Sequence, residues 1–207
     1  MRRRIMYFRE HKCRYRKGKS IMNKGIISNC KNKYIYTDID GTLAEYRFNN
    51  HLSAKDGTAN GQTIEEINNH IFLYSRPLKT VIDTLRKVEK RGIWICGAII
   101  SPIELQDKDI WLRKNCSGID FNGKFWFVSE EYWDMFLDHF NCNKGDMHIF
   151  TQYGFIIKGS KKSMWDWIVN HNLHQLEDCV FLDDVLSYLK YAEERGVTAY
   201  HISSFLE

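Results

Sequence analysis

Two aspartates, Asp38 and Asp40, stand two residues apart and are followed by Gly41 and Thr42. Both carboxylates can face one site if the chain turns after them, and Gly41 permits such a turn because glycine adopts backbone conformations that other residues avoid. Close carboxylates repel each other unless a cation neutralises them or one takes up a proton. The pair therefore predicts a site that binds a cation or transfers a proton, and the alternative is two acids that only cap a turn.

A second acidic pair, Asp183 and Asp184, follows the apolar run 179–182. If both pairs meet at one place, Mg²⁺ is the cation that suits them, because it binds oxygen ligands and keeps several waters. The sequence has no histidine or cysteine cluster with the spacing of a soft-metal site. We expect Asp38, Asp40, Asp183 and Asp184 to be the Mg²⁺ ligands.

A carboxylate beside Mg²⁺ and a lysine suits phosphoryl transfer, since the cations screen the phosphoryl oxygens while the carboxylate attacks phosphorus. The economical assignment makes Asp38 the nucleophile and Asp40 the acid and base that protonates the leaving oxygen and then activates water. Ser101, which follows the apolar run 93–100, can donate its hydroxyl to a phosphoryl oxygen. Its alternative role is to cap a helix after Pro102.

Several lysines compete for the cationic role. Lys161 stands just before the first turn of a predicted helix, and we favour it over its neighbours Lys158 and Lys162. Lys108, which precedes Trp111 in a predicted helix, is the rival. The sequence leaves this choice open, and an ammonium within hydrogen-bond reach of Asp38 would decide it.

The elements that must position these residues alternate between short apolar runs and helical stretches. This alternation predicts an α/β fold, in which a three-layer, Rossmann-like parallel sheet is covered on both faces. Ligands of such sheets bind beyond the carboxyl ends of the strands, where Asp38, Ser101 and Asp183 are expected. We expect strands at 34–37, 93–100, 125–128, 147–150, 154–157, 179–182 and 197–202, and helices that open at Arg76-Pro77 and cover 105–112, 130–140, the stretch after Ser160 and the stretch 185–192.

Composition limits the class of protein. The chain has 207 residues, 43% of them hydrophobic and 27% charged, which suits one compact domain and excludes collagen-like and wholly disordered chains. No apolar run approaches the roughly 20 residues of a membrane-spanning helix. The six cysteines form no CxxC pair, so we expect free thiols, with Cys96 and Cys179 buried. These features predict a cytoplasmic protein without a membrane partner.

The positive charge is concentrated in residues 1–21, which hold nine lysines and arginines against one acid. Such a segment could bind nucleic-acid phosphates, but a solvated extension is the favoured interpretation. We expect a basic, flexible extension at 1–33 and a catalytic domain at 34–207. The polar stretch at about 44–76 is the candidate for a small cap inserted after the first strand.

The motif Asp38-Ile39-Asp40-Gly41-Thr42 after an apolar strand resembles the signature of the haloacid dehalogenase-like (HAD) phosphatase superfamily. The resemblance spans residues 34–202, because later motifs follow in that superfamily's order. It implies an Mg²⁺-dependent phosphomonoester hydrolase that forms an aspartyl-phosphate on Asp38 and acts on a small phosphorylated metabolite such as a nucleotide. The residues it implies for phosphate binding are Thr42, Ser101 and Lys161, and its terminal acidic motif corresponds to Leu182-Asp183-Asp184.

The segment from Asp107 to Leu112 resembles the lysine region of the 5′(3′)-deoxyribonucleotidase branch, in which a lysine precedes a tryptophan-containing helix. Two alternatives to a metabolite phosphatase stay open. The first is a phosphatase of nucleic-acid ends that docks through residues 1–21. The second is a phosphate- or Mg²⁺-binding protein without catalysis on the same scaffold, against which the retention of Asp40 argues, since binding alone needs no acid or base.

Overall fold

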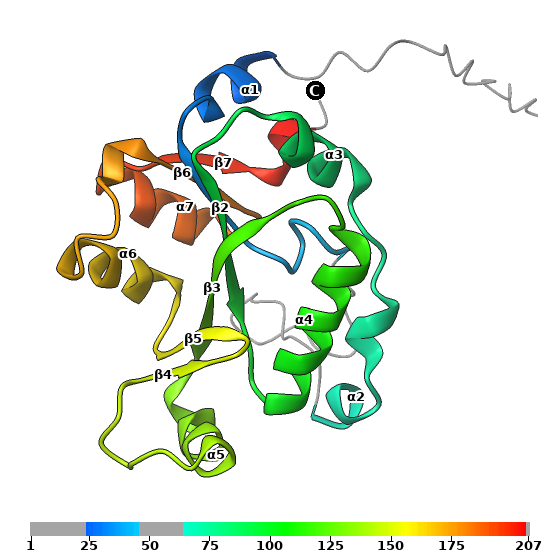
Figure 1. Cartoon of the computed structure of the whole chain (residues 1–207), viewed down its shortest axis with the longest axis vertical. Helices are drawn as coiled ribbons and strands as arrows, with labels where there is room; N and C mark the ends of the chain where they lie inside the picture. The colour runs from blue at the N-terminus through cyan, green and yellow to red at the C-terminus, as the bar shows by residue number, and fades with distance from the viewer. Residues whose placement is uncertain (1–23, 46–63, 206–207) are drawn as a thin grey trace, which may run out of the picture.

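The computed structural model of the chain describes residues 24–45 and 64–205. Within these ranges seven strands form one sheet in the order β4-β5-β3-β2-β1-β6-β7, and every neighbouring pair is parallel except β4 with β5 (Figure 1). The predicted α/β fold with a largely parallel sheet is therefore confirmed. The strands are β1 (Tyr34–Thr37), β2 (Gly92–Ala98), β3 (Phe121–Val128), β4 (His148–Thr151), β5 (Gly154–Lys158), β6 (Cys179–Asp183) and β7 (Thr198–His201).

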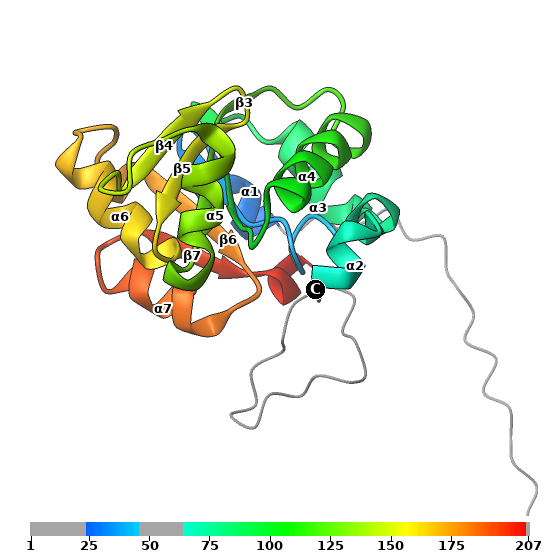
Figure 2. The same ribbon diagram turned by 90° about the horizontal axis from the view of Figure 1, so that it is seen from below.

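Helices cover both faces of the sheet, as Figures 1 and 2 show for α6 and α7 on one side and α3 and α4 on the other. The predicted three layers are therefore present. The helices are α1 (Lys24–Cys30), α2 (Ile64–Asn68), α3 (Lys79–Lys87), α4 (Pro102–Asn115), α5 (Glu130–Phe140), α6 (Lys161–Asn170) and α7 (Leu186–Glu193), and the 3-10 turns are η1 (Ile71–Tyr74), η2 (Leu176–Asp178) and η3 (Ile202–Phe205).

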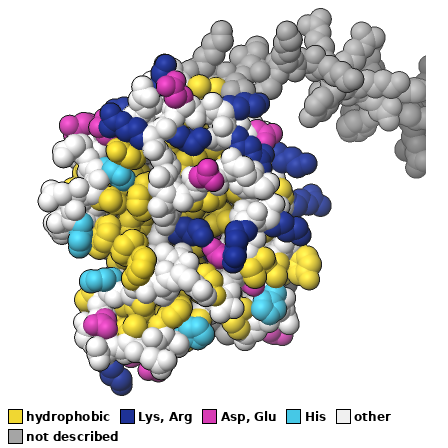
Figure 3. All heavy atoms as spheres, in the orientation of Figure 1, with side chains coloured by type: hydrophobic (Ala, Val, Ile, Leu, Met, Phe, Trp, Pro, Cys, Tyr) yellow, Lys and Arg dark blue, Asp and Glu magenta, His cyan; other side chains and the backbone are white. Residues whose placement is uncertain are grey.

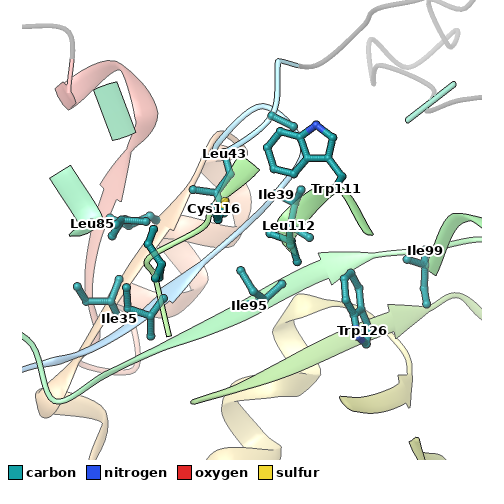
Figure 4. Packing of buried hydrophobic residues seen from close by; sticks show 14 of the residues in the cluster. Ile35, Ile39, Leu43, Leu85, Ile95, Ile99, Trp111, Leu112, Cys116 and Trp126 are labelled. Carbon is teal, nitrogen blue, oxygen red and sulfur yellow. The ribbon is translucent and has the colours of Figure 1, made fainter. Parts of the chain in front are cut away.

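The sheet divides the buried side chains into two cores, because successive residues of a strand point to opposite faces. Ile35 belongs to the core beneath α3 and α4, where Figure 4 shows it near Leu85. Tyr36, the next residue of β1, belongs to the core beneath α6 and α7 together with Trp165. Three of the four β1 residues are buried, so the strand runs through the middle of the fold and its carboxyl end lies between β2 and β6 at the edge of the sheet.

The first described residues of the chain differ from the prediction. Residues 24–33 were assigned to a flexible extension, but residues 24–30 form helix α1, whose Ile26 and Cys30 are buried in the core. The two apolar side chains stand four residues apart, on one face of the helix. That part of the boundary prediction is wrong. The basic segment 1–21 lies outside the described residues, so its nucleic-acid role stays a prediction.

Two helices also begin elsewhere than expected. The predicted helix start at Arg76-Pro77 is wrong: α3 begins at Lys79, because the backbone before it bonds to the loop after β1. The amide of Glu45 donates to the Arg76 carbonyl and the amide of Leu78 donates to the Leu43 carbonyl, each at 2.7 Å. Helix α4 begins at residue 102 and is longer than predicted.

Of the cap predicted at about 44–76, the structure describes residues 44–45 and 64–76, and α2 and η1 of this part pack on α4. The indole N–H of Trp111 donates to the Ser75 carbonyl at 2.8 Å, and the Phe72 ring meets the Trp111 ring edge-on at 5.8 Å between centroids. The rest of the candidate cap, residues 46–63, lies outside the described residues. The cap assignment as a whole therefore stays a prediction.

The surface, the cysteines and the length of the helices can be compared with what the composition predicted. Basic, acidic and apolar side chains are intermixed on the face shown in Figure 3. Cys96 and Cys179 are buried free thiols, as predicted. No helix within the described ranges is long and apolar enough to cross a bilayer. The cytoplasmic location stays a prediction.

Candidate active site

Strand register brings Asp38 and Asp183 together. Thr37 of β1 pairs with Leu182 of β6, so the next residue of each strand reaches the same edge of the sheet. The amide of Asp38 continues this ladder by donating to the Leu182 carbonyl at 2.9 Å. Two carboxylates that are 145 positions apart in the sequence thus become neighbours, as the parallel arrangement of strands predicts.

Lys161 lies between these two carboxylates. Its ammonium is 2.7 Å from Oδ1 of Asp38 and 2.8 Å from Oδ2 of Asp183, and only 6% of its side chain is exposed. The position follows from the start of α6, where the Ser160 side chain accepts from the Lys162 amide and fixes Lys161 as the first helical residue. The ring of Tyr188 covers the same ammonium at 5.3 Å.

Asp184 completes a cluster of three acids. One carboxylate oxygen from each of Asp38, Asp183 and Asp184 lies within 4.8 Å of the others. Gly41 makes this approach possible, since a Cβ atom at that position would stand 2.1 Å from Oδ2 of Asp184. Its backbone also has φ +71°, in the left-handed region that favours glycine. The turn that the sequence predicted at Gly41 therefore also makes room for the acidic cluster.

The cluster fits a divalent cation. Three carboxylates face one ammonium, which leaves two negative charges uncompensated when all are ionised. Oδ1 of Asp38 is fully buried, and although it forms an ion pair with Lys161, it accepts no hydrogen bond of good geometry from the described residues. A buried carboxylate oxygen without such a bond is costly unless a further cation approaches it. Hard oxygen ligands of this kind suit Mg²⁺.

Burial dominates the electrostatics of these acids. It raises the pKa of the Asp38 carboxyl well above its ordinary value; the Lys161 ammonium opposes this shift, and Asp183 reinforces it. Burial likewise raises the pKa of Asp184. For Lys161, burial acts to lower the pKa, but the carboxylates of Asp38 and Asp183 outweigh it, so the pKa is raised and the side chain stays an ammonium.

Asp40 lies outside this cluster of three acids, so the structure does not group it with the other predicted metal ligands. Its carboxylate, 25% exposed, accepts from Lys108 at 2.7 Å. Glu104 is 2.8 Å from the same ammonium, one turn earlier on α4. Glu104 was not predicted from the sequence, although its spacing of four residues from Lys108 is that of a helical ion pair.

The rival lysines have other partners. Lys158 pairs with Glu130 at 2.8 Å, and the Lys162 ammonium lies over the Tyr191 ring at 5.3 Å. Lys108 faces Asp40. Among the described lysines, Lys161 is therefore the one whose ammonium contacts the Asp38 carboxylate, which supports the choice made from the sequence.

Two hydroxyl groups were expected to bind phosphate. Ser101 is the N-cap of α4, and its oxygen accepts from the Glu104 amide at 3.1 Å. The capping role is therefore present, and the hydroxyl proton of Ser101 can still be donated. The Thr42 side chain is buried, and its hydroxyl has no partner within the described part of the chain.

Comparison with known proteins gives the following. No protein-family model and no curated protein matches the sequence. Similar solved structures include a HAD family enzyme from Bacteroides thetaiotaomicron, as a mutant and in wild-type form, each in complex with magnesium and inorganic phosphate; they are 13% and 12% identical to this chain, cover 82% of it and 93% of their own length, and have TM-scores of 0.43. An uncharacterized protein from Corynebacterium glutamicum is 12% identical, covers 82% of this chain and 83% of its own, and has a TM-score of 0.32. Scores this low do not establish a common family, so the function proposed below is argued from the geometry of this chain.

Proposed function

We propose that the protein is an Mg²⁺-dependent phosphomonoester hydrolase of the HAD type that acts through an aspartyl-phosphate on Asp38. The observation that carries the proposal is the arrangement of Asp38, Lys161, Asp183 and Asp184 at the carboxyl ends of β1 and β6. It joins a candidate nucleophile, a cation that stays charged and a set of acids that fits a divalent ion. The resemblance of the segment 38–42 to the HAD signature agrees with this chemistry.

The chain supplies each step of a double displacement. A carboxylate oxygen of Asp38 attacks phosphorus, and the bond from phosphorus to the leaving oxygen breaks while Asp40 gives that oxygen a proton. In the second step water attacks the phosphorus, Asp40 takes the water's proton, and the bond to Asp38 breaks to release inorganic phosphate. Lys161 has two carboxylate neighbours, which leaves one of its three N–H groups for a phosphoryl oxygen.

Asp38, Asp183 and Asp184 would hold the magnesium ion. When bound, Mg²⁺ supplies neutralisation of phosphoryl charge, which lets an anionic carboxylate approach phosphorus. The hydroxyl groups of Ser101 and Thr42 would bind the other phosphoryl oxygens. We assign these two roles from the HAD resemblance and from the free donor capacity of both side chains.

Phosphate release from 4-nitrophenyl phosphate tests the proposal. We expect turnover that needs Mg²⁺ and that falls at least about 10³-fold in Asp38→Asn, because the amide is not a nucleophile. Asp134→Asn, an exposed aspartate of α5, is the matched control and should keep wild-type turnover. Turnover that persists in Asp38→Asn, or that ignores a chelator, contradicts the proposal. Absence of turnover with any phosphate ester would favour the binding-only alternative.

We further propose a small phosphorylated metabolite, such as a nucleotide, as the substrate. The described part of the candidate cap lies close to the site, since the Phe72 ring of η1 has its centroid 5.1 Å from the Lys108 ammonium beside Asp40. A panel of nucleoside monophosphates and sugar phosphates tests the nucleotide version. Equal kcat/KM values for the two groups would contradict it.

A further inference from the structure

The ammonium of Lys108 is saturated with acceptors. It donates to Oδ2 of Asp40 and to the Ala98 carbonyl, each at 2.7 Å, and Oε1 of Glu104 lies 2.8 Å away. An ammonium has three N–H groups, and here three oxygens surround it. With 2% of its side chain exposed, Lys108 has no donor left for a substrate oxygen. In this it differs from Lys161, which has two carboxylate neighbours.

Rigid elements fix this ammonium in place. Glu104 is held on its other side, where Oε2 accepts from the Ile100 amide at 2.8 Å. The Ala98 carbonyl belongs to the last residue of β2, so Lys108 is tied both to the sheet and to its own helix. Phe72 of η1 covers the ammonium at 5.1 Å. A buried charge with all partners in place holds its neighbours in one geometry.

From this geometry we infer that Lys108 is a positioning residue for Asp40, held in turn by Glu104; the inference rests on the proposed function. Lys108 holds Oδ2 of Asp40, which leaves Oδ1 to accept a proton. In the hydrolysis of the aspartyl-phosphate, that oxygen takes the proton of the attacking water, the water oxygen bonds to phosphorus, and the bond from phosphorus to the Asp38 oxygen breaks. Lys108 touches neither phosphate nor water in this step.

The variant Lys108→Met tests the inference with 4-nitrophenyl phosphate, whose leaving group departs without a proton. Formation of the phosphoenzyme then needs no help from Asp40, and only its hydrolysis does. We expect kcat to fall about 10²-fold, the loss typical of a displaced catalytic group, with kcat/KM nearly unchanged and a full burst of nitrophenolate before a slow steady state. Lys90→Met, whose ammonium also donates to backbone carbonyls, is the matched control and should change neither constant.

A merely structural role gives a different result. A structural role would lower the burst amplitude, kcat and kcat/KM together. That outcome overturns the inference if circular dichroism shows that Lys108→Met is folded. A double variant adds an independent test: if Lys108 acts through Asp40, Lys108→Met has no further effect on kcat in an Asp40→Asn background. If the kcat of the double variant falls by the product of the two single-variant losses, the inference is refuted.

Glu104→Gln keeps the inference testable if Lys108→Met does not fold. The amide keeps the size of the side chain but removes the charge that faces Lys108, so we expect a smaller fall in kcat, again with kcat/KM nearly unchanged. Equal falls in both constants refute the inference. Failure of the proposed function is a separate outcome. If the wild-type protein forms no phosphoenzyme, or forms one that Asp38→Asn does not abolish, both proposals are wrong. If the phosphoenzyme forms on Asp38 but turnover is unaltered in Lys108→Met and Glu104→Gln, only the role of Lys108 is wrong.

Discussion

Substitution of Gly41 by alanine separates the metal site from the stability of the fold. The new Cβ atom would stand 2.1 Å from Oδ2 of Asp184, whereas ordinary contacts begin at 3.4 Å, so the carboxylate must move by more than an ångström. The backbone at Gly41 also has φ +71°, which costs a residue with a Cβ about 1–2 kcal/mol. For a chain of this length, that cost corresponds to a fall in Tm of roughly 2–8 °C.

Two further glycines provide matched controls. Gly196 has φ +87° and open space around its Cβ position, so Gly196→Ala carries the backbone cost alone. Gly145 has neither a positive φ nor a close neighbour, and Gly145→Ala should be neutral or stabilising by up to about 1 kcal/mol. The difference between Gly41→Ala and Gly196→Ala therefore isolates the displacement of Asp184.

The assay is thermal unfolding with and without Mg²⁺. At about 100 times its Kd, a ligand stabilises the folded state by about 2.7 kcal/mol, and a tenfold weaker affinity leaves about 1.4 kcal/mol. We expect the Mg²⁺-induced rise in Tm to shrink by about half or more in Gly41→Ala and to stay intact in Gly196→Ala and Gly145→Ala. A full Mg²⁺ response in Gly41→Ala would show that the position of the Asp184 carboxylate does not matter for the ion.

Three other outcomes are expected. Ser101→Ala removes the N-cap of α4 and should lower the free energy of unfolding by about 1 kcal/mol. In steady-state kinetics it should also raise KM for an aryl phosphate. An unchanged KM would exclude Ser101 from phosphate binding. Trp111→Phe leaves the Ser75 carbonyl without its donor and should cost about 1–3 kcal/mol in denaturant unfolding, where a smaller loss would mean that water replaces the indole. Burial raises the pKa of Cys30 to about 12, so less than about 0.1% of this side chain is thiolate at pH 8. Mass spectrometry should therefore find alkylation at the half-buried Cys142 long before Cys30. Equal alkylation rates at the two cysteines would contradict the burial of α1.

The acidic cluster was predictable because its determinants are local. Each acid follows a short apolar run, and the carboxyl ends of parallel strands share one edge of the sheet whatever the details of packing. The role of Lys161 could also be predicted, since Ser160 signals the start of a helix and the first helical turn after β5 returns to that edge of the sheet. The register between β1 and β6 then determines which acids are neighbours, because it places Asp183 beside Asp38.

The partners of Asp40 were not predictable in the same way. The sequence shows that Glu104 and Lys108 share a helix face, but which face of α4 turns toward the loop after β1 depends on tertiary packing. The indole of Trp111, buried against Phe72 of η1, fixes that rotation. The helix α1 was missed for a related reason: its two buried residues, Ile26 and Cys30, are too few to stand out beside a strongly basic segment.

The spacing of Asp38 and Asp40 explains how two like residues acquire different roles. In a continuous strand, residues two apart point to the same side, and both carboxylates would compete for one lysine. Here β1 ends at Thr37, and a tight turn follows, in which the Ile39 carbonyl accepts from the Leu43 and Ala44 amides at 2.9 and 2.8 Å. The turn sends Asp38 to an ammonium that keeps a free N–H and Asp40 to one that has none. A nucleophile needs the first environment, because the cation beside it must also bind phosphate. The second environment suits a proton acceptor, because its lysine partner only has to fix the orientation of the carboxylate.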